Sequence, residues 1–299
     1  MLIAFKTAFD ASVILTTPAR KHLQHFVEQF LDSSFNPLFT AVRRAIEREA
    51  DRVLDIHKRQ YLYLISWFLR AESARRKKKA LGNPHRLGVP ASDLEDYALV
   101  ASVLDQETFV LLNRLMQSAQ DEKRWQDLDA GMKCFTQILL TVQEMSESPL
   151  EEDQEIAENI LSRIFYEETT HDRVAAIVRF YKDQGLGYLD SATELAHVYL
   201  RMLEAYSKQN VDMQVRSKRR TRRKKKAAKE AGEDVGSDVD ESEGEDEARA
   251  EIASSERKFD FKRFSSRFLT QGCVDTFVTF CGFYNDLNAD QLKRAHRFF

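Results

Sequence analysis

Apolar residues recur at every third or fourth position along most of this chain, which is the spacing of one face of an α-helix. The first such set is Leu23, Phe26, Val27 and Phe30, and it follows Thr17 and Pro18. We expect Thr17 to cap this helix and Pro18 to be its first residue. No segment shows sustained alternation of apolar and polar residues, which is the pattern of a half-buried strand. The sequence therefore predicts an all-α protein.

Other helix starts are marked by side chains that accept hydrogen bonds from the first turn. Three pairs have the spacing of a capping box, namely Ser92 with Glu95, Ser191 with Glu194, and Asn288 with Gln291. Ser148 stands before Pro149 and predicts another start. Thr169 and Thr170 are expected to break a longer helical pattern into two helices.

Residues 35–79 form the most distinctive segment. Its first half is charged and periodic, and residues 61–69 are apolar on every side except at Ser66. A helix that is apolar all round must be wrapped by other helices. We therefore expect Leu64, Trp67 and Phe68 to be buried between helix layers. Residues 61–69 are too few to cross a bilayer, which needs about 20 residues, and no membrane association is predicted.

The net charge of −3 conceals two strongly charged segments of opposite sign. Residues 216–229 are mainly Arg and Lys, and residues 230–251 are mainly Asp and Glu. Neither run has enough apolar residues to offset the entropy of ordering. We predict a helical-repeat body over 1–212, a disordered basic-then-acidic insertion over 213–254, and the start of a further, truncated helical unit over 255–299. The body is expected to be an α-solenoid of degenerate HEAT or armadillo type.

The basic run is a candidate for DNA binding or nuclear import. Its cations are Arg216, Lys218, Arg219, Arg220, Arg222, Arg223, Lys224, Lys225 and Lys226. Such density favours phosphates, because binding releases condensed counterions, and it also suits the acidic grooves of import receptors. No aromatic residue is interleaved, so stacking on single strands is not supported. The pattern favours import first and DNA contact second, and a solvated tail is the remaining alternative.

The acidic run contains two candidate phosphorylation sites. Ser237 and Ser242 each precede acidic residues, a pattern that an acidophilic kinase would recognise. The simpler interpretation is a solubilising spacer, which we consider the better supported of the two. Adjacent runs of opposite charge can also pair transiently, and such pairing would compete with DNA for the basic side chains.

A second set of cations is a further candidate for DNA contact. It comprises Arg75, Arg76, Lys77, Lys78 and Lys79. Cations at a helix C-terminus are stabilised by the macrodipole, by about 0.3–1 kcal/mol each, and this structural explanation is preferred. Arg43, Arg44 and Arg48 are expected to be solvated, with Glu47 and Glu49 as partners.

The sequence offers no catalytic arrangement. It contains no phosphate-binding glycine loop, no dinucleotide fingerprint and no nucleophile elbow. His22, His25 and Glu28 share a helix face, but a packed or surface pair is preferred to a metal site. Cys134, Cys273 and Cys281 form no metal-binding pair and are expected to be buried thiols. No enzymatic activity, cofactor or metal is predicted.

Several blocks of this sequence resemble the N-terminal region of the Timeless family. They are Phe35-Asn36-Pro37, residues 43–49 and 52–72, the helix and basic run of residues 200–226, and the sequence ERKFDFKRFSSRF that begins at Glu256 with the blocks GCVDTFVTF and DQLKRAHRFF after it. The order and spacing of the blocks match over most of the chain from about Phe26 onward. Family members extend beyond both ends, and an upstream Arg-Phe-Gly segment of theirs is not found here. The chain is therefore expected to be a fragment.

The resemblance implies a nuclear, non-enzymatic scaffold subunit of the replication fork-protection complex. It would support fork stability and S-phase checkpoint signalling, and would contact duplex DNA without sequence preference. The implied partners are a Tipin-type subunit, a Claspin-type mediator, the replicative helicase and topoisomerase I. The alternative is a generic nuclear helical-repeat adaptor, MIF4G-like or importin-like, in RNA or transport machinery.

Overall fold

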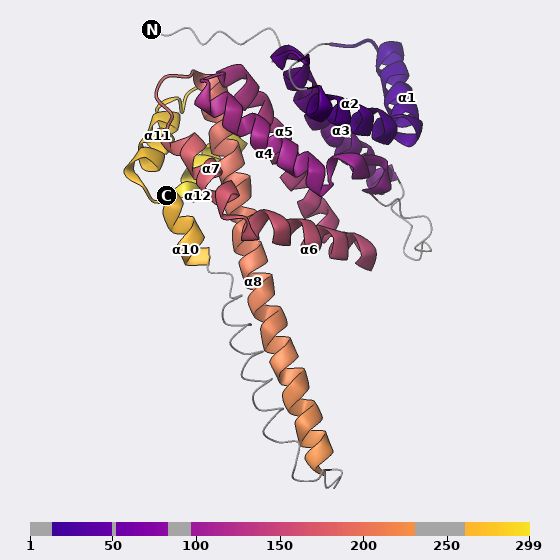
Figure 1. The fold of residues 1–299 in the computed structure, drawn as a ribbon, viewed down its shortest axis with the longest axis vertical. Helices are drawn as coiled ribbons and strands as arrows, with labels where there is room; N and C mark the ends of the chain where they lie inside the picture. Colours follow the sequence, from indigo (N-terminus) through magenta and orange to yellow (C-terminus); the bar gives the residue numbers. More distant parts are fainter. Residues whose placement is uncertain (1–13, 50–51, 83–96, 231–260) are drawn as a thin grey trace. The chain divides into compact units, whose positions relative to one another are not determined.

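The structure is a computed structural model, and it describes residues 14–49, 52–82, 97–230 and 261–299 (Figure 1). Side chains are described in these ranges except at residues 80–82 and 209–230. Every regular element in these ranges is a helix, which confirms the all-α prediction. The elements are α1 (Thr17–Ser33), α2 (Phe35–Arg48), α3 (Asp55–Gly82), η2 (Tyr97–Val103), α4 (Gln106–Asp121), α5 (Trp125–Ser146), α6 (Glu151–Tyr166), α7 (Glu168–Arg179), α8 (Leu186–Glu230), α10 (Phe261–Ser265), η3 (Ser266–Phe268), α11 (Gln271–Gly282) and α12 (Ala289–Phe298).

The chain divides into two units. One comprises Met1–Tyr199 with Phe268–Phe299, and the other comprises Leu200–Arg267. The predicted boundaries differ from this division, because α11 and α12 belong to the same unit as the first helices. In the second unit, α8 continues to Glu230, so residues 213–230 of the predicted disordered insertion have a helical backbone. Lys, Arg and Ala are good helix formers, which accounts for this continuation. The rest of the predicted insertion, residues 231–254, lies outside the described residues.

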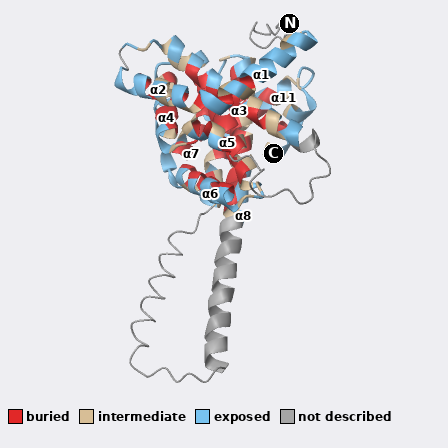
Figure 2. Cartoon of the chain, turned by 90° about the vertical axis from the view of Figure 1, so that its right-hand side faces the viewer, coloured by how far each residue is buried: buried red, intermediate tan, exposed pale blue. Residues whose placement is uncertain are grey.

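Successive helices of the first unit pack side by side, as in a helical-repeat protein. Helix α5 contacts α3, α4 and α6, and α7 contacts α11. Most residues of α5 are buried along its whole length (Figure 2). Gly131 allows α4 to approach closely, since a Cβ atom there would lie 2.6 Å from Cγ of Met116. None of the helices in the described ranges is long and apolar enough to span a membrane.

Aromatic rings fill the space between α1, α2 and α3. Phe35 and Phe39 stack one turn apart on α2, with ring centroids 4.2 Å apart. The ring of Phe68 on α3 lies 5.5 Å from Phe35 and 4.8 Å from Phe30. Phe35, Phe39 and Phe68 are buried. This cluster fixes the turn from α1 into α2 and holds α3 beneath both.

Only part of the prediction for α3 is correct. Phe68 is buried, but Leu64 and Trp67 are 49% and 43% exposed. Helices α1, α2 and α5 contact α3, and Leu64 and Trp67 lie on a side of α3 that stays about half exposed. The apolar segment of residues 61–69 is therefore not surrounded by other helices on every side.

The predicted helix starts have mixed outcomes. Asn288 caps α12 in a reciprocal capping box with Gln291, as predicted. The cap of α1 is Thr16 instead of Thr17, and its side chain accepts from the Ala19 amide at 3.4 Å. Ser191 lies inside α8, not at its start, and its hydroxyl donates to Asp129 at 2.6 Å. The predicted box at Ser92 and Glu95 lies outside the described residues.

Two other predicted starts are close to the observed ones. The break near Thr169 is confirmed, because α6 ends at Tyr166 and α7 begins at Glu168. Ser148 accepts from the amide of Leu150 at 3.3 Å, just before α6. Its own hydroxyl donates to the buried Asp153 at 2.6 Å, so it secures the first turn of that helix.

The last helices return to the first unit. Thr276 of α11 donates to the carbonyl oxygen of Val178 at 2.7 Å, which joins α11 to α7. Gly272 allows this contact, because a Cβ atom there would lie 2.9 Å from the carbonyl oxygen of Arg179. Arg294 of α12 is buried, pairs with Asp190, and lies 5.0 Å from the ring centre of Phe280.

Candidate nucleic-acid interface

The basic run occupies the last part of α8. This helix extends from Leu186 to Glu230, so the run is part of the same helix as the buried Tyr199. Residues 216–226 span about three turns of this helix at 3.6 residues per turn. The side chains of the nine cations named above lie outside the described residues, and so do Ser237 and Ser242. Their roles remain predictions.

The second set of cations lies at the end of α3 and is largely paired within the protein. Arg75 forms two hydrogen bonds with the buried Glu72, at 2.6 and 2.7 Å. Lys77 pairs with Glu144 of α5 at 2.9 Å, and Lys78 donates to Gln24 of α1 at 2.9 Å. These contacts tie α3 to both neighbouring helices. DNA binding by this set stays a prediction, and pairing within the protein would compete with it.

Arg76 packs against an aromatic ring at the same end of α3. Its guanidinium lies 3.6 Å from the ring centre of Tyr97 and 3.4 Å from Glu72. Burial raises the pKa of Tyr97 to about 12, against the opposing effect of Arg76. The phenol is therefore neutral near pH 7, and Arg76 rests on an uncharged ring. Arg76 joins α3 to η2 and has little freedom to reach a phosphate.

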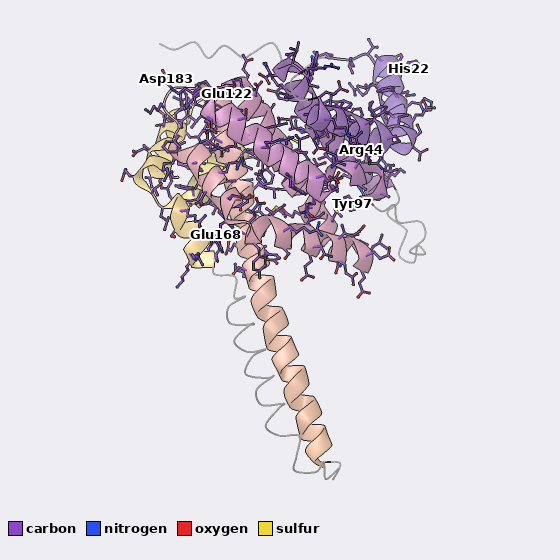
Figure 3. All side chains as sticks on the ribbon, in the orientation of Figure 1. His22, Arg44, Tyr97, Glu122, Glu168 and Asp183 are labelled. Atoms are coloured by element: carbon purple, nitrogen blue, oxygen red, sulfur yellow. The ribbon has the colours of Figure 1, made fainter. Side chains whose placement is uncertain are left out.

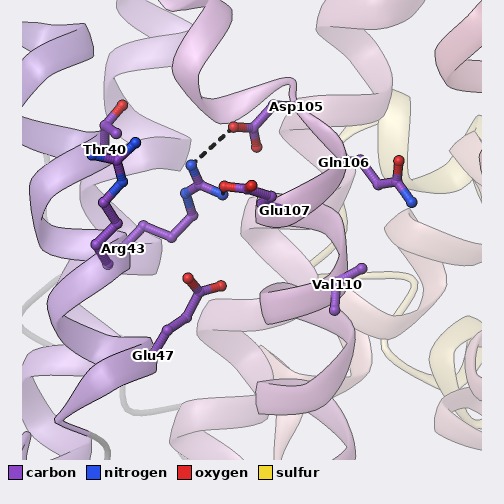
Figure 4. Close-up of a pocket in the computed structure, with 8 residues that line it drawn as sticks. Thr40, Arg43, Glu47, Asp105, Gln106, Glu107 and Val110 are labelled. Carbon is purple, nitrogen blue, oxygen red and sulfur yellow. Dashed lines mark hydrogen bonds and ion pairs between the residues drawn. The ribbon is translucent and has the colours of Figure 1, made fainter.

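A pocket of about 770 Å³ lies between α2 and the start of α4 (Figure 4). Arg43 lies within it, with a side chain only 3% exposed, and pairs with Asp105 at 3.1 Å and with Glu107. Asp105 also caps α4 by accepting from the Thr108 amide at 2.8 Å. The pocket is lined by Thr40, Arg43, Arg44, Glu47, Asp105, Gln106, Glu107 and Val110.

The prediction that Arg43 is solvated is wrong. Arg43 lies four residues after Phe39, on the buried face that also carries Phe35 and Ile46. Its partners are on α4 and not on its own helix, so local spacing to Glu47 could not reveal them. The ion pairs neutralise the buried guanidinium and join α2 to α4. Because these ion pairs hold two helices together, we interpret Arg43 as a structural residue.

The histidines and cysteines considered in the sequence lie on α1, α5 and α11. His22, which is labelled in Figure 3, and His25 are exposed on α1, and Glu28 accepts a hydrogen bond from Gln24 at 2.8 Å. Cys134 and Cys273 are buried free thiols, as predicted, and burial raises the pKa of both, whereas Cys281 is only half-buried. Within the described ranges, no group of three His, Cys, Asp or Glu residues could hold a metal ion.

Several similar proteins share one name. The chain is 67% identical over 293 residues to "Topoisomerase 1-associated factor 1" of Emericella nidulans, and 62% identical over 294 residues to that of Coccidioides immitis. It is 61% identical over 294 residues to that of Phaeosphaeria nodorum. Each alignment covers 97% of this chain and 25% of the relative. No protein-family model matches the chain.

The fold and the charged helix ends define a helical-repeat protein with strongly basic segments. The sequence blocks resemble the Timeless family, and the similar proteins agree with that assignment. The chain belongs to the Timeless family and spans about a quarter of the length of the curated relatives it matches.

Proposed function

We propose that this chain is part of a non-enzymatic scaffold subunit of a replication fork-protection complex. The observation that carries the proposal is its identity of about 60% with topoisomerase 1-associated factors over 97% of its length. The name of those relatives states an association with topoisomerase I, and we extend that association to this chain. The helical-repeat fold supports the proposal, since stacked helices offer long surfaces to several partners at once.

The proposed scaffold acts in the nucleus and assembles several proteins at the fork. Its partners are a Tipin-type subunit, a Claspin-type mediator and the replicative helicase, and its output is fork stability and checkpoint signalling. Co-purification of this chain with the Tipin-type subunit of the same organism tests this part. Failure of the two purified proteins to associate would contradict it for the part of the subunit that this chain represents.

The proposed DNA contact is electrostatic and independent of sequence. The basic run of residues 216–226 supports it, because each cation that neutralises a phosphate releases condensed counterions. Binding to a labelled duplex should then weaken steeply with salt, with a log–log slope of about −0.9 for each phosphate contact. Duplexes of unrelated sequence should bind equally well.

The experiment measures duplex binding by fluorescence anisotropy over a range of salt concentrations. Replacing Arg219, Arg220, Arg222 and Arg223 together by Ala should flatten the salt slope. The matched control replaces Arg20 and Lys21, which are exposed cations of α1, and should leave the slope unchanged. An unchanged slope in the fourfold variant would move the contact elsewhere, with Lys77 and Lys78 as the next residues to replace. Absence of duplex binding at low salt would contradict the DNA contact altogether.

The acidic run that follows is proposed to restrain this DNA contact. Residues 230–251 directly follow the basic run, and tethering gives an effective concentration in the millimolar range, by order of magnitude. Phosphorylation of Ser237 and Ser242 would add about −1.5 to −2 charges each and strengthen the competition. Deleting residues 233–247 should tighten duplex binding at low salt, and the gain should shrink as salt rises. Unaltered affinity at low salt would show that the run is only a spacer.

A further inference from the structure

Helix α3 is apolar on two faces. One face carries Tyr61, Leu62, Ile65, Phe68 and Leu69, which are all buried. The other carries Ile56, Tyr63, Leu64 and Trp67, which are between 37% and 49% exposed. Their spacing of seven, one and three residues places them on one side of the helix over about three turns. We call these four residues the outer stripe.

The outer stripe is held in place by its neighbours. The ring of Trp67 packs edge-on against Phe68, with centroids 4.9 Å apart. The hydroxyl of Tyr63 donates to Asp129 of α5 at 3.0 Å, and the ammonium of Lys133 lies 5.8 Å from the centre of its ring. Side chains that are already ordered lose little entropy when a partner binds. Trp and Tyr are also the residues that most often contribute strongly to protein interfaces.

The exposed charges of α3 itself are cationic, while Asp129 of α5 contacts Tyr63 of the outer stripe. The only acids of α3 are Asp55 and Glu72, and both are paired with cations. Asp55 lies at the start of the helix, and Glu72 is buried. The exposed charges beyond Trp67 are those of Arg70, Lys77, Lys78 and Lys79, of which Lys77 pairs with Glu144 and Lys78 donates to Gln24. A partner that lies along this helix meets apolar side chains first and then a cationic end.

Arg70 is the cation best placed to meet such a partner. It follows Trp67 by three residues, which is nearly one turn, and it is exposed. It forms no ion pair within 4 Å among the described residues, although its charge acts on Glu194. A carboxylate on a docked partner would gain a charge-assisted hydrogen bond there.

We propose that the outer stripe binds an acidic amphipathic helix of a partner protein. The apolar face of that helix would cover Leu64 and Trp67, and its carboxylates would meet Arg70 and the cations at the end of α3. The inference rests on the proposed scaffold function, because it names the chemistry of one docking partner. A docked helix presents apolar anchors at intervals of three, four and seven residues, which matches the stripe. Ile56 and Leu64 are aliphatic and offer no stacking platform, so a single-stranded nucleic acid fits this surface less well.

The test uses Trp67 as its own reporter. The chain has two tryptophans, and Trp125→Phe leaves Trp67 as the only one. The probes are two synthetic helical peptides with the same leucine face, one with Glu and one with Lys at the flanking positions. The Glu peptide should bind saturably and shift the Trp67 emission to shorter wavelength, because the indole leaves water. Its affinity should fall as salt rises, and the Lys peptide should not bind.

Two variants and one control locate the site. Arg70→Glu and Leu64→Ser should each weaken binding of the Glu peptide by about tenfold. Both residues are exposed, so neither change should lower the melting temperature appreciably. Val110→Ser is the matched control, because Val110 is an exposed apolar residue of α4 at 57% exposure. It should leave the affinity unchanged.

Five results would overturn the proposal. Equal binding of the Lys peptide would remove the charge argument, and normal binding to Arg70→Glu and Leu64→Ser would place the site elsewhere. Binding that requires deletion of residues 1–13, or self-association that Leu64→Ser abolishes, would make the occupant this chain itself. A shift of Trp67 emission with single-stranded DNA but not with the Glu peptide would assign the surface to nucleic acid. None of these results depends on duplex binding by residues 216–226, so failure of the stripe and failure of the DNA contact are distinguishable.

Discussion

The rings of Tyr199 and Phe268 lie 6.4 Å apart, although the whole of residues 200–267 separates them in the chain. Both residues are buried within the first unit. The residues that precede and follow residues 200–267 therefore meet inside the first unit. Helices α11 and α12 complete that body through Thr276 and Arg294. The contacts that close the first unit are thus made by residues outside 200–267.

The first prediction follows from this closure. Replacing residues 209–260 by about 20 Gly and Ser residues, a flexible coil with an end-to-end distance of about 25 Å, should leave the body folded. The melting temperature should stay within a few degrees of the original. Loss of the cooperative transition would contradict the prediction and would show that the insertion stabilises the body. Circular dichroism over a thermal scan makes the measurement.

Helix α3 shows how far the apolar pattern could predict the fold. The periodicity predicted helices almost everywhere the structure has them, because local spacing determines which residues share a helix face. It could not predict which faces of α3 are covered, because that depends on helices distant in the chain. Phe68 meets Phe30 and Phe35, whereas Trp67, its neighbour in sequence, meets solvent on one side.

Ion pairs in the candidate site were likewise predictable from the sequence only where both partners lie on one helix. Glu72 was within local reach of Arg75, and the structure pairs them. The partners of Arg43 and Lys77 are Asp105 and Glu144, which lie more than one helix away. Local spacing predicts only pairs on one helix, so the buried role of Arg43 was missed. Its position four residues after Phe39 was the one signal that could have indicated burial.

The second prediction compares two adjacent residues of α3. Phe68→Ala should lower the free energy of unfolding by about 3–5 kcal/mol, because it leaves a cavity in the aromatic cluster. Trp67→Ala should cost about 1 kcal/mol, since Trp67 is 43% exposed and loses mainly its edge-on contact with Phe68. Urea unfolding of both variants measures the difference. Equal costs would mean that the outer stripe is covered in solution.

The third prediction concerns a buried polar chain. The hydroxyl of Tyr199 lies 2.9 Å from Nδ1 of His171, and Nε2 of the same ring lies 2.8 Å from the carbonyl oxygen of Phe165. A carbonyl oxygen can only accept, so Nε2 carries a proton, and in the neutral imidazole Nδ1 accepts from the Tyr199 hydroxyl. Tyr199→Phe leaves that buried nitrogen without its donor and should cost about 1–3 kcal/mol.

Tyr284→Phe is the matched control for this change. Tyr284 is 63% exposed, so removing its hydroxyl should alter the free energy of unfolding by only a few tenths of a kcal/mol. Urea unfolding measures both variants under the same conditions. A cost for Tyr199→Phe as small as that of the control would show that water replaces the lost donor.

The fourth prediction concerns pH. Burial raises the pKa of Glu194 above its ordinary value of 4.5, the opposing effect of Arg294 is smaller, and Asp190 adds to the rise. The folded state therefore favours the protonated carboxyl. The stability that this preference contributes is fully present below pH 4.5 and is lost as pH rises through the pKa of the folded state. Glu194→Gln mimics the protonated form, so it should raise the melting temperature at pH 7, and the gain should vanish in acid.

Glu122 provides a control, because its pKa is shifted in the opposite direction to that of Glu194. A hydrogen bond from Ser118, followed by those from Arg124, lowers the pKa of Glu122. Its charged form is favoured in the folded state, so its contribution is present at pH 7 and is lost as pH falls through the pKa of the folded state. Glu122→Gln should therefore lower the melting temperature at pH 7 and have no effect in acid. Thermal scans from pH 3 to pH 7 compare the two variants. If both shift the melting temperature in the same direction at pH 7, the burial of Glu194 is not what controls its ionisation.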